Sequence, residues 1–181
     1  MTNSENFIGA MSSMYNNLAA NRAYLDSLNV FPVPDSDTGT NLCRTVKGGA
    51  DAVRRQEHLS VTELLEKSAK GMLRCARGNS GVIISALFKG FSDHMNRIGS
   101  FSPAELSAAF DSALKNACRV ISRPIFKGTV LSIVIAGRNA LLENRFSTTK
   151  EAFSILVPAA NEALTQTRFD LEETKKAGVV D

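Results

Sequence analysis

The stretch Asn29-Val-Phe-Pro-Val-Pro-Asp-Ser-Asp-Thr-Gly-Thr-Asn41 ends one helical segment and opens the next. Proline fixes its own φ near −65° and disfavours helical backbone at the residue before it, so Pro32 and Pro34 predict an extended approach. In extended backbone, residues two apart face the same side, which would present Asp35 and Asp37 together. We therefore predict that two carboxylates converge where a helix begins.

The end of this stretch joins acidic residues to a helix start. Carboxylate oxygens suit Mg²⁺ or Ca²⁺, and free N–H groups at a helix N-terminus bind phosphate. Hydroxyl or backbone N–H donors are expected from Thr38, Gly39, Thr40 and Asn41. The stretch thus predicts a site where a metal ion meets phosphates, with a solvated surface turn as the alternative.

Spacing excludes three familiar motifs. An EF-hand loop that began at Asp35 would need glycine and glutamate where the chain has Thr40 and Val46. No G-x-x-x-x-G-K-[ST] occurs, which excludes a P-loop. A G-x-S-x-G elbow would need glycine at Val82, so a serine hydrolase is excluded as well.

Composition is that of an ordinary globular domain. The 181 residues are 44% hydrophobic and 22% charged, which fits one domain over residues 1–181. The net charge of +3 is spread along the chain, so we expect no nucleic-acid partner. No signal peptide or apolar run of about 18 residues is present. We expect a cytoplasmic protein without an integral membrane segment.

Two further features concern redox state and chain length. Cys43, Cys75 and Cys118 are widely spaced without a CxxC pair, which argues against a disulfide framework and a zinc site. The chain stops at Ala-Gly-Val-Val-Asp181 without a polar tail. We expect it to be the N-terminal part of a longer polypeptide.

Helical periodicity dominates, and no segment shows the sustained alternation of a strand, so the chain is predicted to be all-α. Short polar loops favour antiparallel neighbours. The expected helices cover residues 3–27, 38–55, 60–75, 79–97, 103–122, 128–143, a segment that opens at 148, and 171–176.

Helix starts have their own signals. The capping-box spacing occurs at Ser60-Val-Thr-Glu63, Ser102-Pro-Ala-Glu105 and Thr148-Thr-Lys-Glu151. Pro158 falls inside the segment that opens at Thr148 and should kink or reset that helix. His58 and His94 are predicted at the surface, and the methionines and ten phenylalanines in the core.

The loop Ala76-Arg-Gly-Asn-Ser-Gly81 again offers small and polar residues at a helix start. Its backbone N–H groups would hold phosphate, and Ser80 would add a hydroxyl. The predicted ligand-binding residues are Gly78, Asn79, Ser80 and Gly81. A helix junction with a Gly78 C-cap and an Asn79 N-cap is the alternative.

The segment Phe126-Lys-Gly-Thr-Val130 is the third candidate loop. Lys127 would neutralise phosphate charge, and Gly128 would admit a phosphate or purine ring at close range. Thr129 completes this predicted set. The alternative is an ordinary helix start.

At these loops the sequence resembles the nucleotide-binding L-type domain of dihydroxyacetone kinases, and most closely the N-terminal domain of the bacterial fatty acid kinase A-subunit. The motifs that carry the likeness are the stretch 29–41, Ala76-Arg-Gly-Asn-Ser-Gly-Val-Ile83, Gly128-Thr-Val-Leu131 and Lys175-Lys-Ala-Gly-Val-Val-Asp181. Two positions depart from the family pattern: Ser36 stands where glycine is usual, and Asn29 stands near a further aspartate of the dihydroxyacetone enzymes.

The resemblance implies an antiparallel barrel of about eight amphipathic helices that binds ATP at one end. Two Mg²⁺ ions would lie on Asp35 and Asp37, with Asn29 nearby. The implied reaction transfers the γ-phosphoryl of ATP to a fatty acid carboxylate, which a fatty-acid-binding partner protein presents, and gives an acyl phosphate. A dihydroxyacetone kinase-type subunit, a non-catalytic nucleotide-binding module and a homodimer stay open as alternatives.

Overall fold

The structure of the chain, a computed structural model, describes residues 3–31, 33–122 and 124–181. Pro32, one of the two prolines expected to stiffen the approach to Asp35, lies outside these ranges. Within them all regular secondary structure is helical, which confirms the all-α prediction. The elements are α1 (Asn3–Ala20), α2 (Arg22–Ser27), α3 (Thr38–Val53), α4 (Val61–Cys75), α5 (Gly78–Ile98), the short 3₁₀ helix η1 (Pro103–Glu105), α6 (Leu106–Val120), α7 (Val130–Glu143), α8 (Thr149–Asp170) and α9 (Glu172–Ala177).

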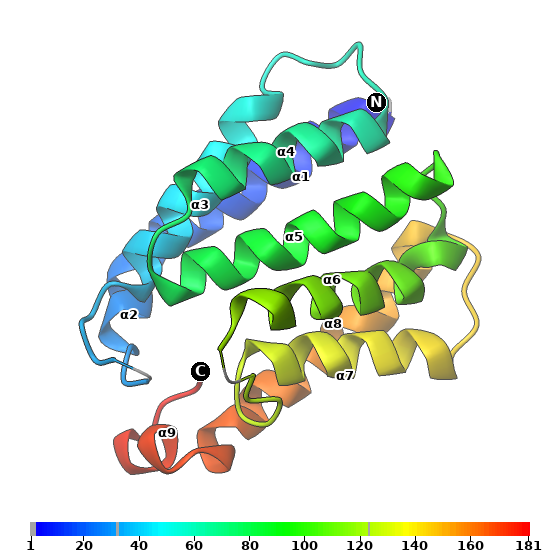
Figure 1. The fold of residues 1–181 in the computed structure, drawn as a ribbon. Coiled ribbons are helices and arrows are strands. Elements are labelled where there is room, and N and C mark those ends of the chain that lie inside the picture. The colour runs from blue at the N-terminus through cyan, green and yellow to red at the C-terminus, as the bar shows by residue number, and fades with distance from the viewer. Residues whose placement is uncertain (1–2, 32, 123) are drawn as a thin grey trace.

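The helices pack as antiparallel neighbours in chain order (Figure 1). From α3 to α8 each helix contacts the next, and α1 lies on α3. This succession is what short loops between amphipathic helices favour. The closely packed pairs run from α1 through α3 to α8, and closure of a barrel between α1 and α8 stays a prediction.

Three apolar clusters hold the array together. The first joins α1, α3 and α4, the second reaches from α4 to α8, and the third joins α5, α6 and α7. Each large side chain buried in this way contributes about 1.5–3 kcal/mol relative to exposure. The core prediction is right for Met11, Met72 and Met95 but wrong for three exposed phenylalanines, Phe126, Phe153 and Phe169.

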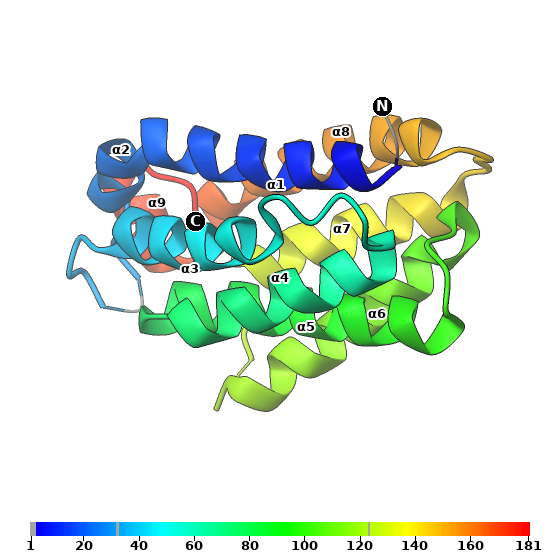
Figure 2. The same cartoon turned by 90° about the horizontal axis from the view of Figure 1, so that it is seen from above.

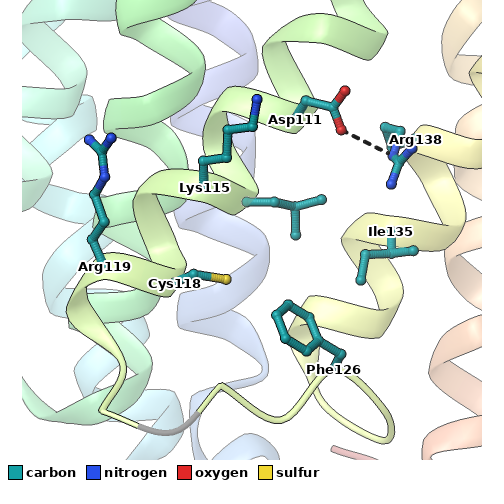
Figure 3. A pocket seen from close by; sticks show the side chains of 8 residues that line it. Asp111, Lys115, Cys118, Arg119, Phe126, Ile135 and Arg138 are labelled. Carbon is teal, nitrogen blue, oxygen red and sulfur yellow. Dashed lines mark ion pairs between the residues drawn. The ribbon is translucent and has the colours of Figure 1, made fainter.

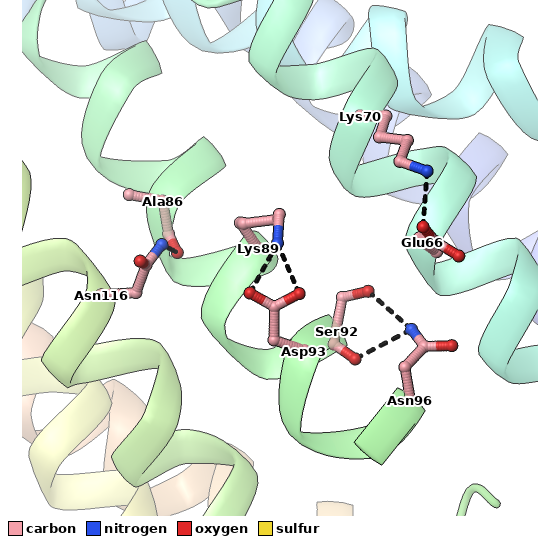
Figure 4. A network of polar contacts seen from close by, with 8 residues as sticks. All are labelled: Glu66, Lys70, Ala86, Lys89, Ser92, Asp93, Asn96 and Asn116. Carbon is pink, nitrogen blue, oxygen red and sulfur yellow. Dashed lines mark hydrogen bonds and ion pairs between the residues drawn. The ribbon is translucent and has the colours of Figure 1, made fainter. Parts of the chain in front are cut away.

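Polar contacts lie outside and between these helices (Figure 4). On the outer surfaces of α4 and α5, Glu66 pairs with Lys70 and Asp93 with Lys89, each one helical turn apart. Asn116 of α6 donates to the Ala86 carbonyl of α5 over 2.7 Å. The surface pairs add little free energy, whereas the Asn116 bond ties two neighbouring helices.

The predicted first helix is interrupted at Asn21, which separates α1 from α2. Asn21 Nδ2 donates to the Asn17 carbonyl at 2.9 Å, and the Asn21 backbone N–H bonds to the same carbonyl at 3.2 Å. An asparagine side chain that competes for backbone groups favours a turn over a continuous helix. The break turns α2 toward the start of α3.

Two of the three predicted capping boxes are confirmed, at Ser60–Glu63 and Thr148–Glu151. The third is wrong, because Ser102 makes no side-chain cap. The Glu105 carboxylate lies instead 2.8 Å from His94 Nε2. His94 is 7% exposed, so its predicted surface position is also wrong. The His94–Glu105 contact explains both the missing capping box and the buried histidine.

Helix α8 continues through Pro158, so the expected reset of the helix there is wrong, whereas a kink stays a prediction. Pro158 lies on the exposed side of α8, where water can bond the carbonyl that lost its N–H donor. No helix of the described ranges is long and apolar enough to cross a membrane. All three cysteines carry free thiols, as their spacing predicted.

Candidate functional site

The N-termini of α3, α5 and α7 lie at one end of the helix array, near the C-terminus of the chain (Figures 1 and 2). Antiparallel neighbours alternate in direction, so every second loop returns to the same end. The three loops singled out in the sequence are the ones that precede these helices. The fold therefore gathers all three at one end.

Asn29 braces the first of these loops. Its Oδ1 accepts the Thr38 hydroxyl at 2.8 Å and the Asp37 N–H at 3.4 Å, while its Nδ2 donates to the Val33 carbonyl at 2.7 Å. The amide that was predicted near the metal thus joins both sides of the loop. Its oxygen already accepts two hydrogen bonds inside the chain.

The backbone between the two aspartates is a turn, which corrects the predicted extended path. Ser36 has φ of 55°, in the left-handed region, and Asp37 has φ −125° and ψ 4°. Glycine adopts positive φ without strain, whereas another residue loses about 1–2 kcal/mol there. The glycine usual in the resembling family fits this turn better than the serine present here.

Both carboxylates of the first loop are free of internal partners. Asp37 is the N-cap residue of α3, yet its side chain makes no capping bond. Asp35 is exposed, and neither carboxylate forms a hydrogen bond or ion pair with another residue of the described ranges. Both are therefore available to a cation.

Asp26 of α2 caps the start of α3, a role that the sequence did not reveal. One carboxylate oxygen accepts the Thr40 N–H at 2.8 Å, and the other accepts the Thr40 hydroxyl at 2.9 Å. The Asn41 N–H bonds to the Asp37 carbonyl at 2.8 Å. Among the predicted donors of this helix start, the backbone N–H groups of Thr38 and Gly39 form no hydrogen bond within the described ranges, although Gly39 itself is buried against α2.

The second loop lies directly against α3. A methyl group at Gly78 would stand 2.3 Å from Asn41 Nδ2, and one at Gly81 would stand 2.5 Å from Thr45 Oγ1. Gly78 also has φ of 61°. Glycine is therefore required here both by conformation and by the close approach of α5 to α3.

The predicted helix junction at the second loop differs in detail. Ala76 is the C-cap of α4, and α5 begins at Gly78 with Arg77 as its N-cap, so the expected Asn79 cap is wrong. Arg77 makes no side-chain cap and donates instead to the Ala76 carbonyl at 2.7 Å. Asn79 and Ser80 lie in the uncapped first turn of α5, where N–H groups are free to bind an anion.

At the third loop, other residues of the chain already bond the N–H groups that begin α7. Thr129 caps α7 by accepting the Leu131 N–H at 3.3 Å, and Asp181 Oδ2 accepts the Val130 N–H at 2.9 Å. Burial raises the pKa of Asp181, although this hydrogen bond lowers it in part. Helix α7 starts at Val130, two residues after the predicted Gly128.

Lys127 and Gly128 also face internal partners. Lys127 Nζ lies 3.4 Å from Asp170 Oδ1, although the lysine side chain is 82% exposed. A methyl group at Gly128, which has φ of 78°, would stand 2.7 Å from Asp170 Cβ. The end of α8 packs so closely against this loop that it explains the glycine by itself, and no bound ligand is needed for that explanation.

The described contacts thus join the predicted site residues in two groups. The first group is the Asp35–Asn41 segment with Gly78–Gly81, and the second is Lys127–Thr129 with the segment 170–181. Within the described ranges no three His, Cys, Asp or Glu side chains form a metal cluster. The site offers two carboxylates rather than a complete protein cage.

Sequence reasoning missed three aspartates: Asp26, Asp170 and Asp181. Asp26 bonds Thr40 across 14 positions, and no local pattern connects the two. Asp181 ends the motif Lys175–Asp181, which carried the family resemblance but indicated no function for this aspartate. All three hold helix ends or loops in place.

Comparisons with known proteins place the chain in a family. The chain matches the family model described as the DAK2 domain over residues 32–181. Uncharacterized proteins of Staphylococcus aureus strains USA300 and bovine RF122 are 36% identical to it over 167 residues. The match covers 91% of this chain and 30% of those relatives, so the chain spans less than a third of their length. On the extent of the family match, the chain belongs to the DAK2 domain family.

Proposed function

We propose that the chain is the ATP- and Mg²⁺-binding domain of an ATP-dependent phosphotransferase. The observation that carries the proposal is the pair Asp35 and Asp37. Within the described ranges both carboxylates lack a partner, and they stand directly before the N–H groups of Thr38 and Gly39, which form no hydrogen bond there. Carboxylates beside a helix N-terminus suit a cation that carries phosphates.

The donor set fits Mg²⁺ better than a metal bound by protein alone. Mg²⁺ keeps several waters and is usually held by one or two carboxylates together with substrate phosphates. Asp35 and Asp37 would supply those carboxylates, and the first turns of α3 and α5 would supply N–H groups for the phosphates. The bound cation would neutralise charge on the transferred phosphoryl group.

The residues around this pair would act by positioning. Asp26 fixes the start of α3 through Thr40, and the close fit of Gly78 on Asn41 sets α5 beside it. Arg77, in the second loop beside Gly78, adds a positive charge. Lys127 would contribute once its tether to Asp170 loosens. Phosphoryl transfer depends mainly on such positioning and on charge neutralisation.

The proposed acceptor is a fatty acid carboxylate that a partner protein presents, with an acyl phosphate as product. This choice rests on the resemblance of residues 29–41 to the fatty acid kinase branch. It also agrees with the chemistry, because an ionised carboxylate needs little help from a general base. His94, bonded to Glu105 inside the fold, is then not needed for proton transfer.

Isothermal titration of ATP in the presence of Mg²⁺ tests the binding step. A coupled ADP-release assay with two acceptors, a fatty acid on its carrier protein and dihydroxyacetone, tests the reaction class. Release with the fatty acid alone supports the proposal, and release with dihydroxyacetone alone favours the triose kinase alternative. ATP binding without ADP release with either acceptor would identify a non-catalytic module.

A further inference from the structure

A groove of about 470 Å³ separates α6 from α7 beside the third loop (Figure 3). Its apolar lining comes from Leu114, Phe126 and Ile135. Its cationic side chains are Lys115, Arg119 and Arg138. Neither Asp35 nor any residue of the second loop belongs to it, so it is distinct from the proposed phosphate site.

The groove has an excess of positive charge. Asp111 is its one acidic residue, and its Oδ1 lies 3.4 Å from Arg138 Nε. Lys115 and Arg119 form no ion pair with any residue that the structure describes. They stand one turn apart on α6, where like charges destabilise a helix. A bound anion would relieve this repulsion.

Arg138 is only partly neutralised by Asp111. Its Nε is buried and makes no hydrogen bond within the described part of the chain, because Asp111 lies beyond bonding geometry. A buried donor without an acceptor is costly. The Arg138 side chain is 26% exposed, so a carboxylate in the groove would meet the exposed part of this cation and not the buried Nε.

The apolar part of the groove is open to a partner. The Phe126 side chain is 52% exposed at one edge, and the neighbouring Ile125 is 38% exposed. Large exposed apolar side chains rimmed by charge are typical of protein interaction sites. A small inorganic anion would leave this apolar surface uncovered.

We propose that the α6–α7 groove binds an acidic amphipathic helix of a partner protein. Apolar side chains of that helix would cover Phe126 and Ile135, and its carboxylates would pair with Lys115 and Arg119. Two carboxylates one helical turn apart match the spacing of these two cations. A helix in a groove between two helices is a common mode of peptide recognition.

The test uses a fluorescein-labelled synthetic peptide with leucines along one helical face and glutamates beside them. Fluorescence anisotropy should detect binding that weakens as NaCl rises. Charge reversal in the double variant Lys115→Glu with Arg119→Glu should lower the affinity at least about tenfold. Phe126→Ala should lower it as well.

Two controls separate docking from general electrostatics. Arg145→Glu with Lys150→Glu changes net charge equally in the α7–α8 loop and the first turn of α8, and should leave the affinity unchanged. A peptide with glutamine in place of each glutamate should bind at least about tenfold more weakly. Mg²⁺-ATP titration of the groove variant should match the wild-type chain, which keeps this proposal independent of the proposed function.

Cys118 reports occupancy of the groove directly. It is a half-buried free thiol of the groove lining, and Cys75, also half-buried, lies on α4 outside it. The peptide should slow maleimide labelling of Cys118 but not of Cys75. Equal binding by the charge-reversed variant, equal binding of the glutamine peptide, or unprotected Cys118 would each overturn the proposal.

Discussion

The Asp26 carboxylate accepts both the backbone N–H and the hydroxyl of Thr40, at 2.8 and 2.9 Å. The bonds connect α2 to the third residue of α3. They hold the helix start against which the Asp35–Asp37 turn is built, so the proposed site depends on a residue outside the motif.

Asp26→Ala should destabilise the chain by about 1–2 kcal/mol, because it removes a helix cap and leaves two donors without their acceptor. Urea unfolding measures the change. Asp93→Ala, which removes an exposed ion pair with Lys89, is the matched control and should cost less than about 1 kcal/mol. Equal effects of the two substitutions would argue against the cap.

Ser36→Gly should stabilise the chain by up to about 1 kcal/mol, because relief of the positive φ exceeds the added backbone entropy of glycine. Arg55, with φ of 61°, offers a matched control outside the site. Arg55→Gly should stabilise similarly. Only Ser36→Gly should also change Mg²⁺-ATP affinity, and a loss of stability in Ser36→Gly would contradict the turn described here.

Gly78→Ala should destabilise the chain more than Gly99→Ala. Both glycines have positive φ, 61° and 76°, which costs alanine about 1–2 kcal/mol. A methyl group meets Asn41 at Gly78 but nothing within 4 Å at Gly99. Thermal unfolding compares the two variants, and titration should show weaker nucleotide binding for Gly78→Ala alone. Equal stabilities of the Gly78→Ala and Gly99→Ala variants would show that α5 is not in close contact with α3 at Gly78.

Acid should weaken the start of α8. The N–H bonds from Ser147 and Thr148 lower the pKa of Glu151 below its ordinary 4.5. A carboxylate whose pKa is lowered by folding stabilises the fold above its ordinary pKa, and this stabilisation is lost as pH falls through the lowered value.

Glu151→Gln should therefore flatten the fall of melting temperature below pH 4.5. Glu63→Gln, in the other confirmed capping box, should act alike, since hydrogen bonds with Ser60 lower the pKa of Glu63. Circular dichroism at several pH values measures both. An unchanged acid slope in the double variant would contradict this assignment.

Local sequence signals predicted most of the fold. Capping at Ser60 and Thr148 and the helical periodicity required only near neighbours, and both were right. Errors arose where a polar side chain bonded a group that the spacing rules do not include. Glu105 fits a capping box by spacing, yet it binds His94 across 11 positions, and Asn21 breaks a helix that apolar periodicity alone would continue.

The candidate site followed the same rule. The motifs predicted Asp35, Asp37 and the glycine loops from turn and helix-start chemistry, which is local, and the binding role of these residues stays a prediction. The capping of Thr40 by Asp26 and of Val130 by Asp181 spans 14 and 51 positions, and no spacing rule links such pairs. Ser36, where the resembling family usually has glycine, was the one local sign of a left-handed backbone, because its φ is 55°.

The central claim is tested most directly by isothermal titration of Mg²⁺-ATP into the double variant Asp35→Ala with Asp37→Ala. Glu143→Ala with Glu162→Ala removes two exposed carboxylates elsewhere and serves as the charge-matched control. The account predicts that binding is abolished in the first variant and kept in the second. Wild-type affinity in the Asp35 and Asp37 variant would contradict it.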